Sequence, residues 1–243
     1  MTAVDAEPLA APRFSKSARG RLTTKDLGRF PGGTLFDRLG RAVCGASCLP
    51  RRELYEAWEM ARRVRRRFRG GRVVDLAGGH GLLAQILLLL DDTSRTAVVV
   101  DPVVPASAPR VQAALCEIWP RLDGRVTFVC GDLHATAIGP TDLVVSCHAC
   151  GALTDLVIER AVAAGARVAA LPCCHDLGSG AAEPLRGWVD GPLAIDIGRA
   201  TRLGEAGYRV WTQTIPAEIT EKNRLLMAAP KARGVRGAII SGT

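Results

Sequence analysis

Apolar runs of strand length alternate with helical patterns along most of the chain from residue 72 onward. Short apolar runs bounded by polar or glycine residues predict strands, and stretches with a period near 3.6 residues predict helices. The predicted strands lie near residues 72–76, 97–101, 126–130, 142–147, 167–172, 208–215 and 224–229. The predicted helices lie near residues 51–68, 82–90, 107–118, 152–164 and 193–206.

The order of these elements predicts a doubly wound α/β fold. Strands separated by helices pair in parallel, because a parallel connection needs a crossover of about a dozen residues or more. Only residues 216–223 separate the last two predicted strands, which is too short for a helical crossover. These strands are therefore expected to pair as an antiparallel hairpin. The prediction is a seven-stranded, mostly parallel sheet closed by that hairpin.

The same pattern divides the chain into three parts. Residues 1–50 form an N-terminal basic extension, residues 51–230 form one α/β domain, and residues 231–243 form a C-terminal tail. Residues 1–33 are rich in Ala, Pro, Gly and basic residues and are expected to form a loosely packed arm.

The net charge of +8 comes almost entirely from arginine, and two segments concentrate it. The first segment contains Arg13, Lys16, Arg19, Arg21, Lys25 and Arg29. The second contains Arg51, Arg52, Arg62, Arg63, Arg65, Arg66, Arg67, Arg69 and Arg72, and most of it belongs to a predicted amphipathic helix over residues 51–68. Such stripes neutralise phosphates on nucleic acids, although a solvated arginine face is an equally good interpretation.

Several cellular settings are disfavoured by the sequence. No apolar run reaches the roughly 18–20 residues of a membrane span. The first thirty residues carry Asp5 and Glu7 and lack the apolar core of a signal peptide. The eight cysteines are typical of reduced thiols in an ordinary α/β domain rather than of a disulfide framework. A cytoplasmic protein without a membrane partner is therefore expected.

A glycine-rich turn follows the first predicted strand. Asp75 ends that strand, residues 77–81 (Ala-Gly-Gly-His-Gly) form the turn, and Asp101 ends the next strand. The carboxyl ends of parallel strands meet at one edge of a sheet, so both acids should face the same crevice. Glycines allow close approach of a ligand, and the second acid can hold ribose hydroxyls. This arrangement predicts a nucleotide pocket.

Two kinds of nucleotide fit this pocket. Gly79-x-Gly81-x-x-Ala84 followed by Asp101 also satisfies the dinucleotide fingerprint, so an NAD(P)-dependent oxidoreductase is the alternative enzyme class. However, Asp75 would repel the pyrophosphate of a dinucleotide, whereas it would attract the ammonium group of a methionine-bearing nucleoside. The turn therefore favours the second kind of ligand.

Cysteine and histidine residues cluster after the fourth and fifth predicted strands. His148 and Cys150 follow the fourth strand, and Cys173-Cys174-His175 follows the fifth. Neighbouring strands would bring both segments to one site. There, His148 or His175 could orient or deprotonate a substrate.

Two other interpretations of the cluster stay open. Thiols could bind a metal, but we expect none, because adjacent cysteines do not easily bind one ion and zinc-like spacing is absent. Alternatively, Cys130, Cys147 and Cys173 are expected to be buried as small apolar residues.

These motifs together resemble the class I S-adenosylmethionine-dependent methyltransferases. The turn is similar to Asp-x-Gly-x-Gly-x-Gly, with Ala77 at the first glycine position. His148-x-Cys150-Gly151 with Thr154-Asp155, and Cys173-Cys174-His175, look like a group that includes tRNA ribose 2′-O-methyltransferases and methyltransferase-like proteins. Residues 219–228 resemble the closing hairpin of that group.

The resemblance implies a Rossmann-like methyltransferase fold, S-adenosyl-L-methionine as cofactor, and RNA modification at a ribose hydroxyl. It implies cofactor-binding residues Asp75, Ala77, Gly78, Gly79, Gly81, Asp101, Asp132 and Leu133. It implies the catalytic residues His148 and His175, with Asp155 as an orienting carboxylate. RNA would be bound through the Arg-rich helix and the N-terminal arm. Protein and small-molecule acceptors stay open, as does an RNA-binding module without turnover.

Overall fold

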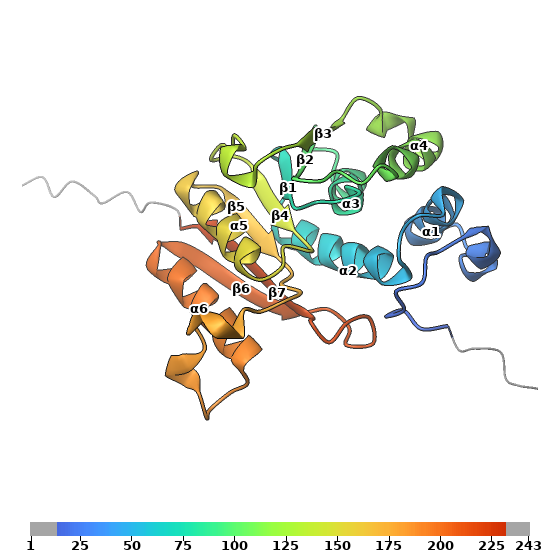
Figure 1. Ribbon diagram of the computed structural model, residues 1–243. Coiled ribbons are helices and arrows are strands. Elements are labelled where there is room, and N and C mark those ends of the chain that lie inside the picture. The colour runs from blue at the N-terminus through green and yellow to red at the C-terminus, as the bar shows by residue number, and fades with distance from the viewer. Residues whose placement is uncertain (1–13, 232–243) are drawn as a thin grey trace, which may run out of the picture.

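The computed structural model describes residues 14–231. Its centre is a seven-stranded sheet in the order β3-β2-β1-β4-β5-β7-β6 (Figure 1). The strands are β1 (Val73–Leu76), β2 (Ala97–Asp101), β3 (Val126–Cys130), β4 (Leu143–Ser146), β5 (Arg167–Ala170), β6 (Tyr208–Thr214) and β7 (Arg224–Pro230). The first five strands pair in parallel, and β7 runs antiparallel to both β5 and β6. The predicted mostly parallel sheet with an antiparallel closing hairpin is confirmed.

Helices cover both faces of this sheet (Figure 1). One core contains residues of α1 (Leu35–Ala46), α2 (Arg51–Arg67), α3 (Leu82–Leu90) and α4 (Ala108–Ile118). The other contains residues of α5 (Ala152–Ala163) and lies beneath α6 (Gly191–Glu205). Short 3-10 helices span Thr24–Arg29 (η1), Pro120–Leu122 (η2), Leu133–Ala135 (η3), Leu177–Ser179 (η4) and Glu183–Leu185 (η5). Within residues 14–231, none of the helices is long and apolar enough to span a membrane.

The burial of the strands explains their apolar sequence. Side chains alternate across a strand, so Val73 enters the core on the α2 side and Val74 enters the core on the α5 side. Strands covered on both faces lose the polar alternation of a half-exposed sheet. By the same alternation, Asp75 points to the α2 side. The strand order reverses between β1 and β4, and ligands of open α/β sheets bind at such a point.

The segment before α2 is packed, not loose. Leu22 and Phe30 are 0% and 1% exposed, and the Leu22 N–H donates to the Leu49 carbonyl at 3.0 Å. Phe30 fits against α1 because Gly40 has no side chain: a Cβ there would lie 2.3 Å from the Phe30 ring. The expectation of a loosely packed arm is therefore wrong for residues 14–33.

The pattern of apolar positions also missed α1 itself. Arg13 of the basic arm and the predicted tail beyond Lys231 lie outside the described residues. The domain boundaries that the sequence suggests stay a prediction.

One arginine of the basic helix lies inside the protein. The Arg65 side chain is 2% exposed, and its Nε donates to the Leu87 carbonyl at 3.0 Å. Its guanidinium also donates to Ser94 Oγ at 2.9 Å and lies 3.2 Å from Asp91 Oδ2. By contrast, the neighbouring Arg66 is exposed. The arginines of α2 are therefore not one uniform solvated stripe.

We expect Arg65→Met to lower the free energy of unfolding by about 3 kcal/mol, because it removes the buried positive charge that pairs with the Asp91 carboxylate and the donors to Leu87 and Ser94. Urea unfolding of the full chain measures this loss. The matched control is Arg66→Met one position along α2, which should change the same free energy by less than about 0.5 kcal/mol. Equal effects of the two substitutions would contradict the assignment of Arg65 to the core.

Candidate functional site

The turn between β1 and α3 is made of left-handed and closely packed residues. Gly79 and Gly81 have φ of 52° and 67°. A Cβ on Gly78 would lie 2.8 Å from Asp75 Cγ, and one on Gly81 would lie 2.8 Å from Phe128 Cζ. Ala77 also has a positive φ, 55°. The turn therefore keeps the backbone shape that glycine favours even where alanine stands.

Carboxylates stand at the ends of β2 and β3, the two strands on one side of β1. Asp101 Oδ2 accepts a hydrogen bond from the Gly79 N–H at 3.0 Å, and Oδ1 accepts from the Val103 N–H at 3.0 Å. Each oxygen keeps a second lone pair for a hydroxyl of a ligand. Asp132 follows β3 and caps η3 by accepting from the His134 N–H at 2.9 Å. Leu133 beside it is buried.

Asp75 is buried beneath the turn. It is 1% exposed, and neither of its carboxyl oxygens has a well-formed hydrogen bond among residues 14–231, although the Ala84 N–H lies near enough to lower its pKa. Burial raises the pKa of Asp75 to about 8. A buried carboxyl group without a partner is costly, and a cation placed against it would relieve that cost.

Two further acids, which the sequence analysis missed, face the same interior from α2. Glu56 is 3% exposed, and burial raises its pKa. Burial, and then the charge of Glu56, raise the pKa of Glu53 to about 7. Glu56 follows Glu53 by three residues, and buried Met60 follows Glu56 by four, so all three lie on one face of α2. This position on the apolar face of the helix could have identified the two acids from the sequence. After burial, the charges of Asp101 and then Glu53 also raise the pKa of Asp75, so Glu53 lies within reach of the buried carboxyl group.

His148 lies just beyond β4, next to these acids. Its Nε2 is 3.8 Å from Glu56 Oε2, and its side chain is 36% exposed. Its Nε2 atom is buried, and this burial and the charge of Arg52 lower the His148 pKa to about 4, so its imidazole is neutral near pH 7. It can therefore accept a hydrogen bond at one ring nitrogen and donate one at the other.

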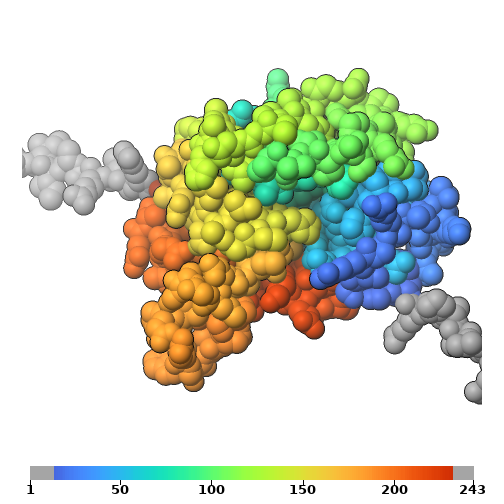
Figure 2. Space-filling view, in the orientation of Figure 1, coloured from blue at the N-terminus to red at the C-terminus, as the bar shows by residue number. Residues whose placement is uncertain are grey.

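Two adjoining cavities meet at His148. The first, of about 440 Å³, is lined by Arg19, Pro50, Arg52, Glu53, Glu56 and His148. The second, of about 630 Å³, is lined by Ser17, Arg19, Arg52, His148, three cysteines and residues 217–222. The N-terminal segment and the β6–β7 loop, which lie together in Figure 2, form its rim, and Lys16 Nζ donates to Glu218 Oε1 at 2.8 Å across them. The basic extension thus forms part of the site.

The other two predicted catalytic residues lie elsewhere. His175 Nε2 is 2.9 Å from Asp196 Oδ1, and the His175 side chain is 2% exposed. Asp155 is bonded to the buried Arg199 at 2.7 Å. These contacts join α5, α6 and the loop after β5. The structure therefore does not bring Asp155 to His148, and it does not place His175 on the His148 cavities.

The cysteine segments after β4 and β5 do converge, as expected. Cys150 Sγ and Cys173 Sγ are 3.0 Å apart. Cys147 is buried, as predicted, but Cys130 is exposed and Cys173 is half-buried. The expectation of a buried apolar role is therefore wrong for Cys130, which ends a strand whose outer residues face solvent.

The sequence model of a family described as a methyltransferase domain matches residues 52–179, from α2 past β5. No curated protein sequence matches the chain.

Solved structures similar to it include ribosomal protein L11 methylase from Lactobacillus delbrueckii subsp. bulgaricus, at 14% identity over 73% of this chain and 78% of that one, with a TM-score of 0.46. Another is the B. subtilis M1A22 tRNA methyltransferase TrmK, at 15% identity over 72% and 66%, with a TM-score of 0.48. A third is the Methanococcus jannaschii fibrillarin pre-rRNA processing protein, at 12% identity over 68% of each chain, with a TM-score of 0.44.

We expect Ala77→Gly to raise the free energy of unfolding by about 1 kcal/mol, because it removes the steric cost of a left-handed alanine. The control is Ala113→Gly, an exposed position in α4, where the same exchange should cost about 0.5–1 kcal/mol. Thermal or urea unfolding measures both. A loss of stability in Ala77→Gly would contradict the left-handed turn.

We expect the stability of the unliganded protein to fall as pH rises from about 4 to 8, because folded Asp75 holds its proton more tightly than the unfolded chain does. Above the Asp75 pKa of about 8 this loss is complete. Asp75→Asn lacks this titration, so its advantage in free energy of unfolding over wild type should grow across the same range. Urea unfolding at about pH 5 and pH 8 tests this. An advantage that is constant with pH would show that Asp75 is not a buried acid.

Proposed function

This chain belongs to a family of methyltransferase domains, and we propose on that premise that it uses S-adenosylmethionine to methylate RNA, at a ribose hydroxyl. The observation that carries the proposal is the buried Asp75 carboxyl, which lies beneath the glycine turn without a partner among the described residues. Glu53 and Glu56, whose pKa values burial also raises, add two more carboxyl groups that a positive charge would help to ionise. These carboxyl groups favour a ligand that carries a positive charge, such as S-adenosylmethionine.

The residues around the turn fit this donor. When bound, S-adenosylmethionine supplies an electrophilic methyl group on a positively charged sulfonium. Asp75 would face its ammonium group, Asp101 would accept hydrogen bonds from its ribose, and Asp132 with Leu133 would border its adenine. The backbone of Ala77, Gly78, Gly79 and Gly81 would form the floor. A dinucleotide would instead bring phosphate charges toward three acids, which is unfavourable.

His148 is the residue that we assign to the acceptor. It lies between the acidic region and the larger cavity, and its neutral ring can accept a hydrogen bond from a hydroxyl group. Holding that hydroxyl in line with the methyl group is the main requirement of a displacement at a sulfonium. Of the three predicted catalytic residues, we propose a catalytic role for His148 alone. His175 pairs with Asp196, and Asp155 pairs with Arg199, away from this cavity.

The rim of the larger cavity supports an RNA acceptor. Arg19, Arg52 and Lys222 line it together with Glu218 and Glu221, and Glu218 is already paired with Lys16. Arginine and lysine groups at this rim suit the phosphates that flank a target nucleotide. Exposed arginines at the far end of α2 would extend the contact, apart from the buried Arg65.

Transfer of a tritiated methyl group from labelled S-adenosylmethionine into fractionated total RNA tests this function. We expect label in RNA that alkaline hydrolysis leaves in dinucleotides, because a 2′-O-methyl group prevents cleavage of the adjacent phosphodiester bond. His148→Ala should lower kcat about 100-fold with unchanged donor affinity, because alignment of the acceptor is lost. His148→Asn, which keeps a hydrogen-bond acceptor, should recover part of this loss.

Three results would contradict parts of the proposal. Label confined to proteins or small molecules would overturn the RNA acceptor. Intact donor binding without transfer to any fraction would overturn the enzyme in favour of a binding module. A His148→Ala variant with full kcat would remove His148 from the acceptor site.

A further inference from the structure

We propose that Cys150, Cys173 and Cys174 form a thiolate site for a zinc ion on the wall of the larger cavity. This site goes beyond the proposed methyl transfer and does not depend on it. The three residues come from two chain segments, one after β4 and one after β5. The β4 and β5 strands are paired directly, with Ser146 opposite Ala170.

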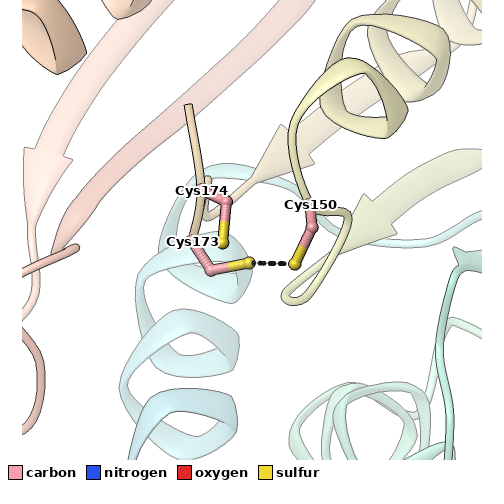
Figure 3. Close-up of side chains that lie close together, drawn as sticks. All are labelled: Cys150, Cys173 and Cys174. Atoms are coloured by element: carbon pink, nitrogen blue, oxygen red, sulfur yellow. Dashed lines mark hydrogen bonds between the residues drawn. The ribbon is translucent and has the colours of Figure 1, made fainter. Parts of the chain in front are cut away.

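The positions of the sulfur atoms suit one ion. All three Sγ atoms lie within 4.8 Å of one another, and those of Cys150 and Cys173 are 3.0 Å apart. Figure 3 shows the three thiols turned toward one another. Zinc binds thiolate sulfur at about 2.3 Å, so in tetrahedral geometry its sulfur ligands lie roughly 3.8 Å apart. That spacing falls within the range of these contacts and needs only small rotations of the side chains.

The local backbone explains how adjacent cysteines can share an ion. In a strand, Cys173 and Cys174 would point to opposite faces. Residues 171–176, however, belong to no helix or strand. Both side chains can therefore turn toward Cys150, and the sequence-based argument that adjacent cysteines disfavour a shared ion does not hold at this position.

The donor set selects the type of metal. Three soft sulfur ligands favour Zn²⁺ or Cu⁺ over the hard cations that bind oxygen. All three thiols are free, and Cys150 and Cys174 are exposed, so an ion can reach them. Three protein ligands leave a fourth position of tetrahedral zinc open, as in sites where the ion binds water or substrate. The thiols line the same 630 Å³ cavity as His148, so this open position would face the acceptor.

A second group, Glu56, Cys147 and His148, also has ligand atoms within 4.8 Å of one another. It is the weaker candidate because Glu56 and Cys147 are buried, which limits access for an ion. We therefore place the metal on the thiols and leave the imidazole of His148 free for the acceptor.

Zinc content of the full chain, purified under reducing conditions without chelator, tests the site. We expect inductively coupled plasma mass spectrometry to find about one Zn²⁺ per chain. Cobalt(II) added to the chelator-treated protein should give a thiolate charge-transfer band and the intense visible bands of a tetrahedral site. Cys150→Ser and Cys174→Ser should each lose the zinc and both spectral features. Cys130→Ser, an exposed thiol on β3 outside the cluster, is the matched control and should keep them.

Three results would overturn the proposal. The first is reduced wild-type protein that binds neither Zn²⁺ nor Co²⁺. The second is full zinc content in Cys150→Ser and Cys174→Ser with unchanged thermal unfolding. The third is a Cys150–Cys173 disulfide in peptides from the reductively purified, zinc-free chain, which would make the pair a redox couple. Since no methyl donor enters these measurements, failure of the metal site and failure of the proposed methyl transfer are separate outcomes.

Discussion

The burial of the Asp75 carboxyl group between β1 and α2 is the constraint on which the site depends. With a pKa of about 8, its ionisation at pH 7 costs on the order of 1 kcal/mol. A ligand with a positive charge at this point recovers that cost, whereas an anionic ligand adds to it. Glu53 and Glu56 strengthen the effect, because both lie on the face of α2 that packs toward the sheet. The choice of ligand is therefore set by buried acids more than by the glycine turn.

The fold supplies this arrangement through simple geometry. Alternation along β1 sends Asp75 to the α2 side while Val74 and Leu76 enter the opposite core. His148 follows β4, the strand paired with β1, and lies against Glu56 of α2. The N-terminal segment, held by Leu22 and Phe30, closes the cavity from the other side. The proposed sites for methyl donor and acceptor thus both lie at the carboxyl ends of β1 and β4.

The sequence predicts the sheet well because its strands and helices have clear periods. Segments held by isolated apolar residues are different. Leu22 and Phe30 show no period of their own, so the packing of residues 14–33 and the helix α1 could not be foreseen. By contrast, the glycine turn and the acids Asp75 and Asp101 were identified from their spacing in the sequence. Glu53 and Glu56 were missed because the surrounding arginines made α2 look like a solvated basic helix.

Long-range pairing explains the remaining differences. His175 and Asp155 are placed by Asp196 and Arg199, which are distant in sequence and belong to α6. No local motif predicts such contacts. The thiol cluster depends on an irregular backbone after β5, where the regular alternation of a strand gives no guidance. In both cases the sequence identified the chemically important residues, but only the folded structure shows where their side chains point.

Calorimetric titration of the full chain with S-adenosylmethionine and, separately, with NAD⁺ is the most direct test of the acidic pocket. The account predicts saturable binding of S-adenosylmethionine that weakens at least about tenfold in Asp75→Asn, and no comparable binding of NAD⁺. Tighter binding of NAD⁺, or equal affinity for S-adenosylmethionine in Asp75→Asn and wild type, would contradict it.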